Sequence, residues 1–70
     1  MQLTADDVFK LRETKHLTQE QFAEKIGVHH SLVCLMEKGK TPVSRRIAVR
    51  IVAAFGLTHD ALMELREMPV

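Results

Sequence analysis

The sequence predicts an all-α fold, a compact domain of five short helices. Apolar residues recur at spacings of three and four, as along one face of a helix, whereas a half-buried strand would alternate at every second residue. Threonine, serine and glycine residues that suit helix ends divide the chain at short intervals. Strand signals are nearly absent, because neither an Asn-Gly nor an Asp-Gly turn occurs.

The first helix is expected to begin after Thr4, whose side-chain oxygen can cap an unpaired amide at the helix start. Asp7 follows three residues later, where a carboxylate favours the positive end of a helix. The helix should stop near residues 15 and 16. Its inward residues are Val8 and Leu11, with Phe9 at the border of the core.

The second helix is expected to start after Thr18, which has Gln21 three residues later in the same capping pattern, and to end at Gly27. Its packing residues are Phe22, Ala23 and Ile26. A helical wheel of the next segment, starting at His30, separates two faces. The inward face has Leu32, Val33, Met36 and Glu37, and the outward face has His30, Ser31, Cys34 and Leu35.

Gly39 and Pro42 predict a turn, after which Ser44 is a suitable cap for a fourth helix that Gly56 closes. Its apolar residues are Ile47, Ile51 and Phe55, flanked by Ala48 and Val52. Thr58 caps a last helix. The remaining inward residues are Leu57, Leu62 and Leu65, and Pro69 prevents extension of this helix.

The length and composition predict one small domain spanning residues 1–70. Apolar residues make up 46% and charged residues 27%, as in ordinary globular chains. The apolar run at residues 51–55, which no other run exceeds, is too short to cross a bilayer. Acidic residues stand where a signal peptide would be apolar, so a cytoplasmic protein without a membrane partner is expected. With one cysteine the domain can form no intramolecular disulfide, and self-association would add buried area.

The net charge of +1 conceals an uneven distribution. The nine acidic residues avoid residues 38–50, and this stretch holds half of the ten basic residues. The basic residues there are Lys38, Lys40, Arg45, Arg46 and Arg50. A run of charged residues is often only a solvated surface. Whether this one binds a partner depends on the segments that adjoin it.

Residues 19–38 have the spacing of a helix-turn-helix, with a small residue where two crossing helices meet and a glycine in the turn. Around this unit the chain resembles the Cro and repressor family of helix-turn-helix regulators, also called the Xre family, from about residue 8 to residue 65. The matching segments are residues 11–12, 17–28, 37–40 and 54–57.

The resemblance implies a lambda-repressor-like domain whose third helix enters the major groove of double-stranded DNA while the second crosses the backbone. It implies a bacterial or phage-encoded transcription regulator, Cro-like or a small repressor, that binds an inverted-repeat operator as a homodimer in the cytoplasm and nucleoid.

The expected base-reading residues are His30, Ser31, Cys34 and Leu35. The expected phosphate contacts are Gln19, His29, Lys38, Lys40, Thr41, Arg45 and Arg46, where the family uses backbone amides as well as side chains. Arg12 and Glu37 match a structural pair, and the dimer candidates are Phe55, Leu57, Met63 and Met68.

Two residues depart from the family pattern. Leu35 stands where lysine, arginine or glutamine is common, and Cys34 where a small polar residue is common, which weakens hydrogen-bond readout of bases. Leu35 could press on a thymine methyl group or meet another protein. Cys34 could be a small groove-facing residue or a redox switch. The alternative function is a protein-interaction module, such as an antitoxin or antirepressor-type partner, that docks through Leu32, Cys34 and Leu35.

Catalysis, cofactors and metal binding are not expected. The chain has no glycine-rich phosphate loop and no paired carboxylates in an evident pocket, so no catalytic residue is assigned. The adjacent His29 and His30 diverge by about 100° on a helix and cannot easily share a metal ion.

Overall fold

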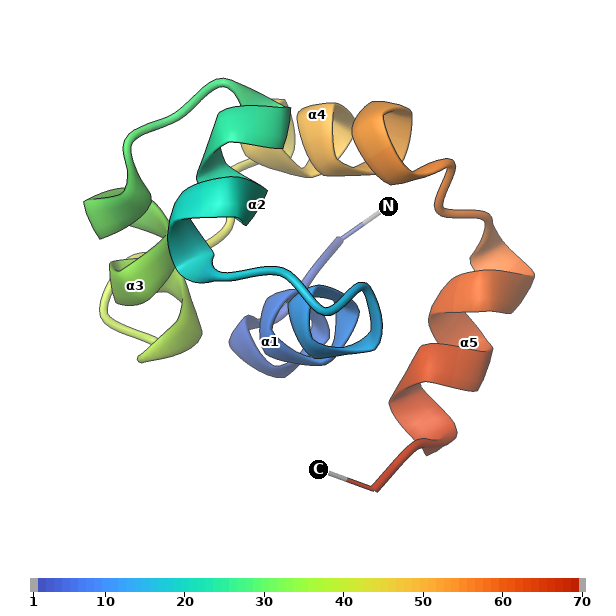
Figure 1. Cartoon of the computed structure of the whole chain (residues 1–70). Coiled ribbons are helices and arrows are strands. Elements are labelled where there is room, and N and C mark those ends of the chain that lie inside the picture. The colour runs from blue at the N-terminus through green and yellow to red at the C-terminus, as the bar shows by residue number, and fades with distance from the viewer. Residues whose placement is uncertain (1, 70) are drawn as a thin grey trace.

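The computed structural model describes residues 2–69 and contains five helices, as predicted (Figure 1). They are α1 (Ala5–Thr14), α2 (Gln19–Ile26), α3 (His30–Glu37), α4 (Arg45–Phe55) and α5 (His59–Glu67). The described residues contain no strand, so the predicted all-α class is confirmed. Within the same residues, no helix has the length and apolar character needed to cross a membrane.

The predicted helix ends are confirmed by their hydrogen bonds. Four caps use a hydroxyl oxygen that accepts a backbone N–H three residues on, and these caps are Thr4, Thr18, Ser44 and Thr58. Gly27 and Gly56 end α2 and α4 in the left-handed conformation, with φ of +72° and +60°. Because a side chain is strained there, glycine allows the abrupt change of direction after each helix.

The helices bury one shared core. Its most deeply buried side chains are Val8, Phe22, Val33, Met36 and Ile51, and all five were expected to face inward. The rings of Phe22 on α2 and Phe55 on α4 stack with their centroids 5.0 Å apart. Leu3 also lies in the core although it precedes α1 and belongs to no helical pattern, so the sequence did not indicate it.

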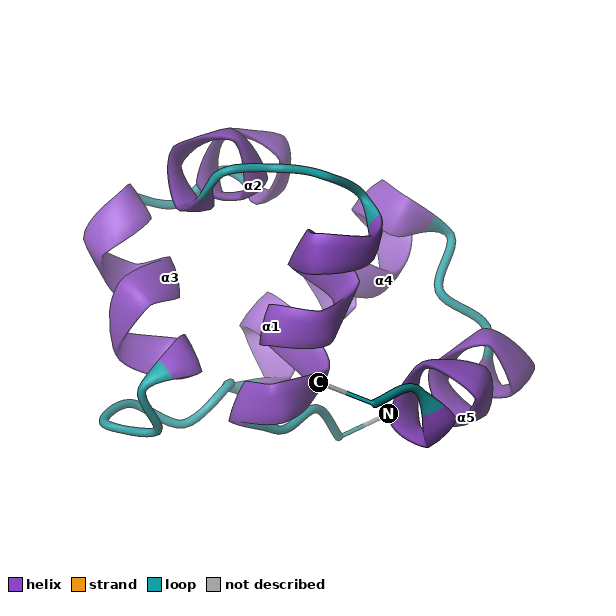
Figure 2. Cartoon of the chain, turned by 60° about the horizontal axis from the view of Figure 1, so that its bottom comes forward, coloured by secondary structure: helices purple, strands orange, loops and turns teal. Residues whose placement is uncertain are grey.

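The arrangement leaves α3 at one side of the molecule. In both views α3 and α5 lie on opposite sides of α1, and α2 lies near α3 (Figures 1 and 2). Helices α2 and α3 pack together, and α2 also contacts α4. One face of α3 is therefore buried against the rest of the domain while the other faces outward.

An ion pair between a buried carboxylate and an exposed arginine joins α1 to α5. The Asp7 side chain is only 3% exposed and accepts hydrogen bonds of 3.1 and 2.9 Å from Nε and Nη2 of Arg66. It also accepts from the backbone N–H of Thr4. Burial by itself raises the pKa of the Asp7 carboxyl, but the hydrogen bonds from Arg66 and Thr4, with the positive charge of Arg66, lower the pKa below its ordinary value of 3.8.

This pair predicts a specific acid sensitivity. Because the folded-state pKa of Asp7 is lowered, ionised Asp7 stabilises the fold above about pH 4, and the stabilisation is lost as pH falls through the lowered pKa. The variant Asp7→Asn is expected to have a lower Tm than wild type at pH 7, and the difference should shrink between about pH 5 and pH 2. Thermal unfolding followed by circular dichroism checks this, with the exposed Asp6→Asn as control. A difference that does not change with pH would contradict the account.

Candidate nucleic-acid interface

The turn between α2 and α3 is held by three features. Gly27 adopts the left-handed conformation, and the backbone N–H of Val28 donates to the carbonyl of Ala23 at 3.0 Å. From α4, Nη1 of Arg50 donates to the carbonyl oxygen of Gly27 at 3.2 Å. The last contact was not foreseen, because Arg50 was grouped only with the basic stretch.

The residues of α3 divide into an inward and an outward face as the helical wheel predicts. Val33 and Met36 are buried, Leu32 is half-buried, and the Glu37 side chain is 7% exposed. On the opposite side, His30, Ser31 and Leu35 are exposed and Cys34 is half-buried. The outward position of the four candidate base readers is therefore observed, while their contact with bases remains a prediction.

His29 caps the start of α3, a role that the sequence did not indicate. Its Nδ1 accepts a hydrogen bond of 3.2 Å from the backbone N–H of Ser31 and lies 2.8 Å from the Ser31 hydroxyl oxygen. A ring nitrogen that accepts from an N–H carries no proton, so the neutral His29 ring has its proton on Nε2. Because His29 precedes α3 instead of lying on it, the expected divergence of the two histidines is wrong, and the His29 and His30 ring centroids lie 4.4 Å apart.

Arg12, Glu37 and Gln19 form a network between α1, α2 and α3. Arg12 donates to Glu37 from Nε at 2.7 Å and from Nη2 at 3.1 Å, a bidentate pair, and from Nη1 to the carbonyl of Leu17 at 2.9 Å. The Gln19 amide also donates to Glu37, at 3.2 Å. The expected structural pair and one expected phosphate contact are thus brought together.

The network is charged and largely shielded from water. The side chains of Arg12 and Glu37 are 13% and 7% exposed. The hydrogen bonds to Glu37 raise the pKa of the Arg12 guanidinium more than burial lowers it, and the charges of Glu37 and Glu13 add to the increase. Arg12 therefore stays positive and neutralises a carboxylate that lies beside the start of α2.

The loop after α3 presents side chains outward but uses its backbone amides internally. Lys38 and Lys40 are exposed and Thr41 is half-buried. The N–H groups of residues 38–41 all donate to carbonyls of α3, and those of Lys40 and Thr41 both reach Leu35. The amides of residues 38–41 are therefore paired within the chain in this conformation, which leaves the side chains of these residues as their groups for a phosphate contact.

Arg45 and Arg46 are exposed in the first turn of α4, and this turn contains no acidic residue. Cations at the N-terminal end of a helix face the positive end of the macrodipole, which is the unfavourable arrangement. The same end attracts anions through its dipole and its unpaired amides. Two arginines at this position therefore create a strongly positive surface.

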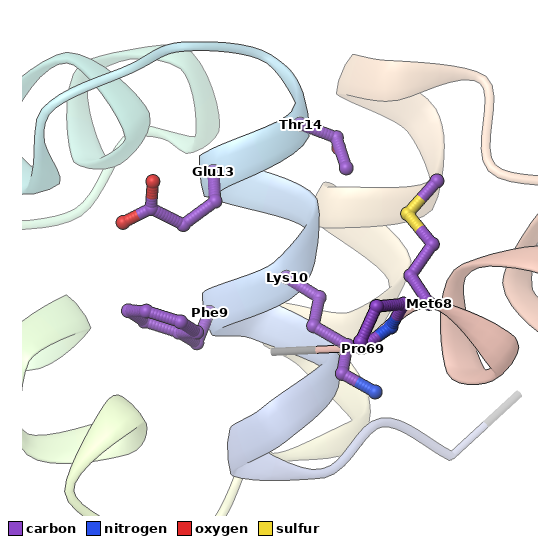
Figure 3. Close-up of a pocket in the computed structure, with 6 residues that line it drawn as sticks. All are labelled: Phe9, Lys10, Glu13, Thr14, Met68 and Pro69. Carbon is purple, nitrogen blue, oxygen red and sulfur yellow. The ribbon is translucent and has the colours of Figure 1, made fainter.

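The four dimer candidates differ in exposure, although three of them, Phe55, Leu57 and Met68, line one hollow between α1, α4 and α5. Leu57 is in the core at 6% exposure, and Phe55 is stacked on Phe22. Met63 and Met68 are about two-fifths exposed, at 43% and 44%. Met68 lines an apolar hollow between α1 and the end of α5, together with Phe9, Lys10, Glu13, Thr14 and Pro69 (Figure 3). None of the candidate DNA-contacting residues lines this hollow.

Two short helices joined at a left-handed glycine, with the second exposed along its outer face, define a helix-turn-helix protein. A family model described as helix-turn-helix matches residues 8–62. The chain belongs to this family, and the resemblance to the Cro and repressor (Xre) type is confirmed.

Curated relatives agree with this assignment. An uncharacterized HTH-type transcriptional regulator of Methanocaldococcus jannaschii is 39% identical over 46 residues, which cover 66% of this chain and 70% of the relative. Another such regulator, from Methanothermobacter thermautotrophicus, is 40% identical over 48 residues, which cover 69% of this chain and 70% of the relative. One from Archaeoglobus fulgidus is 37% identical over 46 residues, covering 66% of each chain. No solved structure matches the chain significantly.

Proposed function

We propose that this helix-turn-helix protein is a sequence-specific DNA-binding transcriptional regulator, a Cro-like protein or a small repressor. The outward face of α3 reads bases in the major groove, and the flanking cations bind phosphates. The observation that carries the proposal is the exposed face of α3 followed directly by four exposed cationic side chains. These are Lys38, Lys40, Arg45 and Arg46.

The position of the cations favours an anionic polymer over a merely solvated surface. Arg45 and Arg46 oppose the dipole of their own helix, so a bound phosphate would relieve an arrangement that is unfavourable in the free protein. Gln19 and His29 extend the phosphate-binding surface to the starts of α2 and α3. The Gln19 amide has a second N–H besides the one that Glu37 accepts, and the His29 ring has its Nε2 proton.

The proposal includes a homodimer on an inverted repeat. Two-fold symmetry would place two α3 helices in successive major grooves, about 34 Å apart. Met63 and Met68 are the dimer candidates that remain exposed, and both belong to α5 or its end, on the side of α1 away from α3. A protein-interaction module that docks through Leu35 remains the alternative, since this leucine is exposed.

Two alanine variants test the division between base and phosphate contacts. His30→Ala is expected to relax the preference at one or two operator positions by about 1 to 3 kcal/mol. Lys40→Ala is expected to weaken binding to every sequence alike and to reduce the salt slope by about 1 for each lost contact. Binding is measured by titration of duplexes recovered by selection from random DNA, and of duplexes with single changes.

Glu24→Ala serves as a control, because Glu24 is exposed on α2 and has no assigned DNA contact. If His30→Ala and Lys40→Ala both lower affinity uniformly, the division of roles is wrong. If no duplex binds with a sequence preference, the protein-interaction alternative gains support.

A further inference from the structure

The centre of the outward face of α3 has little capacity to donate hydrogen bonds. Ser31 and Leu35 lie one helical turn apart, opposite the buried Val33 and Met36. Leu35 is 39% exposed and has no polar atom. Cys34 is half-buried, and a thiol is a weak donor.

The Ser31 hydroxyl has a partner within the chain. Its oxygen lies 2.8 Å from His29 Nδ1, the nitrogen that accepts the Ser31 backbone N–H. While this contact is kept, His29 competes with a base edge for the hydroxyl. A hydroxyl also fits either a donor or an acceptor on a base edge, so Ser31 discriminates weakly between bases.

We propose that Leu35 reads the 5-methyl group of a thymine in the major groove and is a principal specificity determinant of this protein. The inference rests on the proposed DNA-binding function. The methyl group of thymine is the apolar feature that the major groove offers. Against any other base, the leucine would remove polar edges from water without replacing their hydrogen bonds, so the same contact also disfavours the wrong bases.

Charge complementarity favours DNA over a protein as the occupant of this surface. Lys38 follows Leu35 by one turn at the end of α3, and Lys40 lies in the adjoining loop, both exposed. The backbone carbonyl of Leu35 also accepts the N–H groups of Lys40 and Thr41, at 3.0 and 3.3 Å. The position of the leucine is thus tied to the basic loop, and phosphate binding by this loop would set how deeply Leu35 enters the groove.

The test replaces thymidine by deoxyuridine, one position at a time, in the duplex recovered by selection from random DNA. Deoxyuridine keeps the pairing and the O4 acceptor and lacks only the methyl group. At one thymine in each half-site, the change is expected to lower wild-type affinity about fourfold, the value of burying one methyl group. Leu35→Ala should bind the thymine and uracil duplexes equally, whereas Leu35→Met, which keeps an apolar side chain, should retain part of the difference.

Val49→Ala is the matched control, since Val49 is an exposed apolar residue on α4. This variant should retain the wild-type ratio of the affinities for the thymine and uracil duplexes. Circular dichroism establishes that each variant is folded. Equal wild-type affinity for all thymine and uracil duplexes would overturn the inference and leave the proposed function standing. Discrimination that persists in Leu35→Ala would overturn the assignment to this residue. Failure to prefer any recovered duplex over random DNA would overturn both the inference and the proposed function.

Discussion

Replacing Arg12 by alanine is expected to lower the free energy of unfolding by about 3 to 5 kcal/mol, because it leaves a buried carboxylate without its counter-charge. The Glu37 side chain is 7% exposed and receives both of its charged hydrogen bonds from Arg12. The substitution also removes the hydrogen bond that Arg12 Nη1 donates to the Leu17 carbonyl oxygen. A domain of this size has a total stability of about 4 to 10 kcal/mol, so the variant should lose a large fraction of its stability. Urea and thermal denaturation measure the change.

Two controls separate the buried pair from a general loss of charge. Glu13→Ala removes the exposed carboxylate that lies 3.6 Å from Arg12, and its effect should stay below about 1 kcal/mol. Replacing both partners, as Arg12→Met with Glu37→Leu, should recover much of the stability, since no buried charge is then left unpaired. A Tm of Arg12→Ala equal to that of wild type would contradict the role assigned to the pair.

Phe22→Ala is expected to cost about 3 to 5 kcal/mol, through lost burial and the cavity that remains. Phe22 is 0% exposed and stacks on Phe55, so its ring joins the helix-turn-helix to α4. The stacking itself contributes about 1 kcal/mol beyond burial, which a double-mutant cycle of Phe22→Ala and Phe55→Leu separates from the burial of each ring. Chemical denaturation gives the free energies.

The control for Phe22→Ala is the substitution of a large apolar residue that lies outside the core. Val49 is 61% exposed, and Val49→Ala should change stability by less than about 0.5 kcal/mol. Similar losses in both alanine variants would mean that the domain is not held by the core described above.

The helices and most of the core could be predicted because their signals are local. Thr4, Thr18, Ser44 and Thr58 each precede a helix, and every cap closes within three residues along the chain. The inward and outward faces of α3 follow from the helical period alone. The sequence also indicated which side chains could face a partner.

The contacts that fix the candidate site in space could not be read from local patterns. Asp7 and Arg66 are 59 residues apart, and Arg50 and Gly27 are 23 apart, so only the packed fold brings them together. The helical pattern shows that Glu37 faces inward and needs a partner, but the choice of Arg12 came from the family resemblance. The internal use of the amides in residues 38–41 depends on the exact path of the loop, which residue types do not specify.

The central claim is that this chain binds DNA through a positive surface beside α3, and the salt dependence of wild-type binding tests it most directly. Each phosphate neutralised by a cation contributes about −0.9 to the slope of log K against log salt, so four cations on each subunit of a dimer predict a slope of about −7. The affinity of the duplex recovered by selection is measured between about 50 and 200 mM salt, and a loss of about 10⁴-fold is expected. A slope near zero, or binding that does not distinguish this duplex from random DNA, would contradict the account.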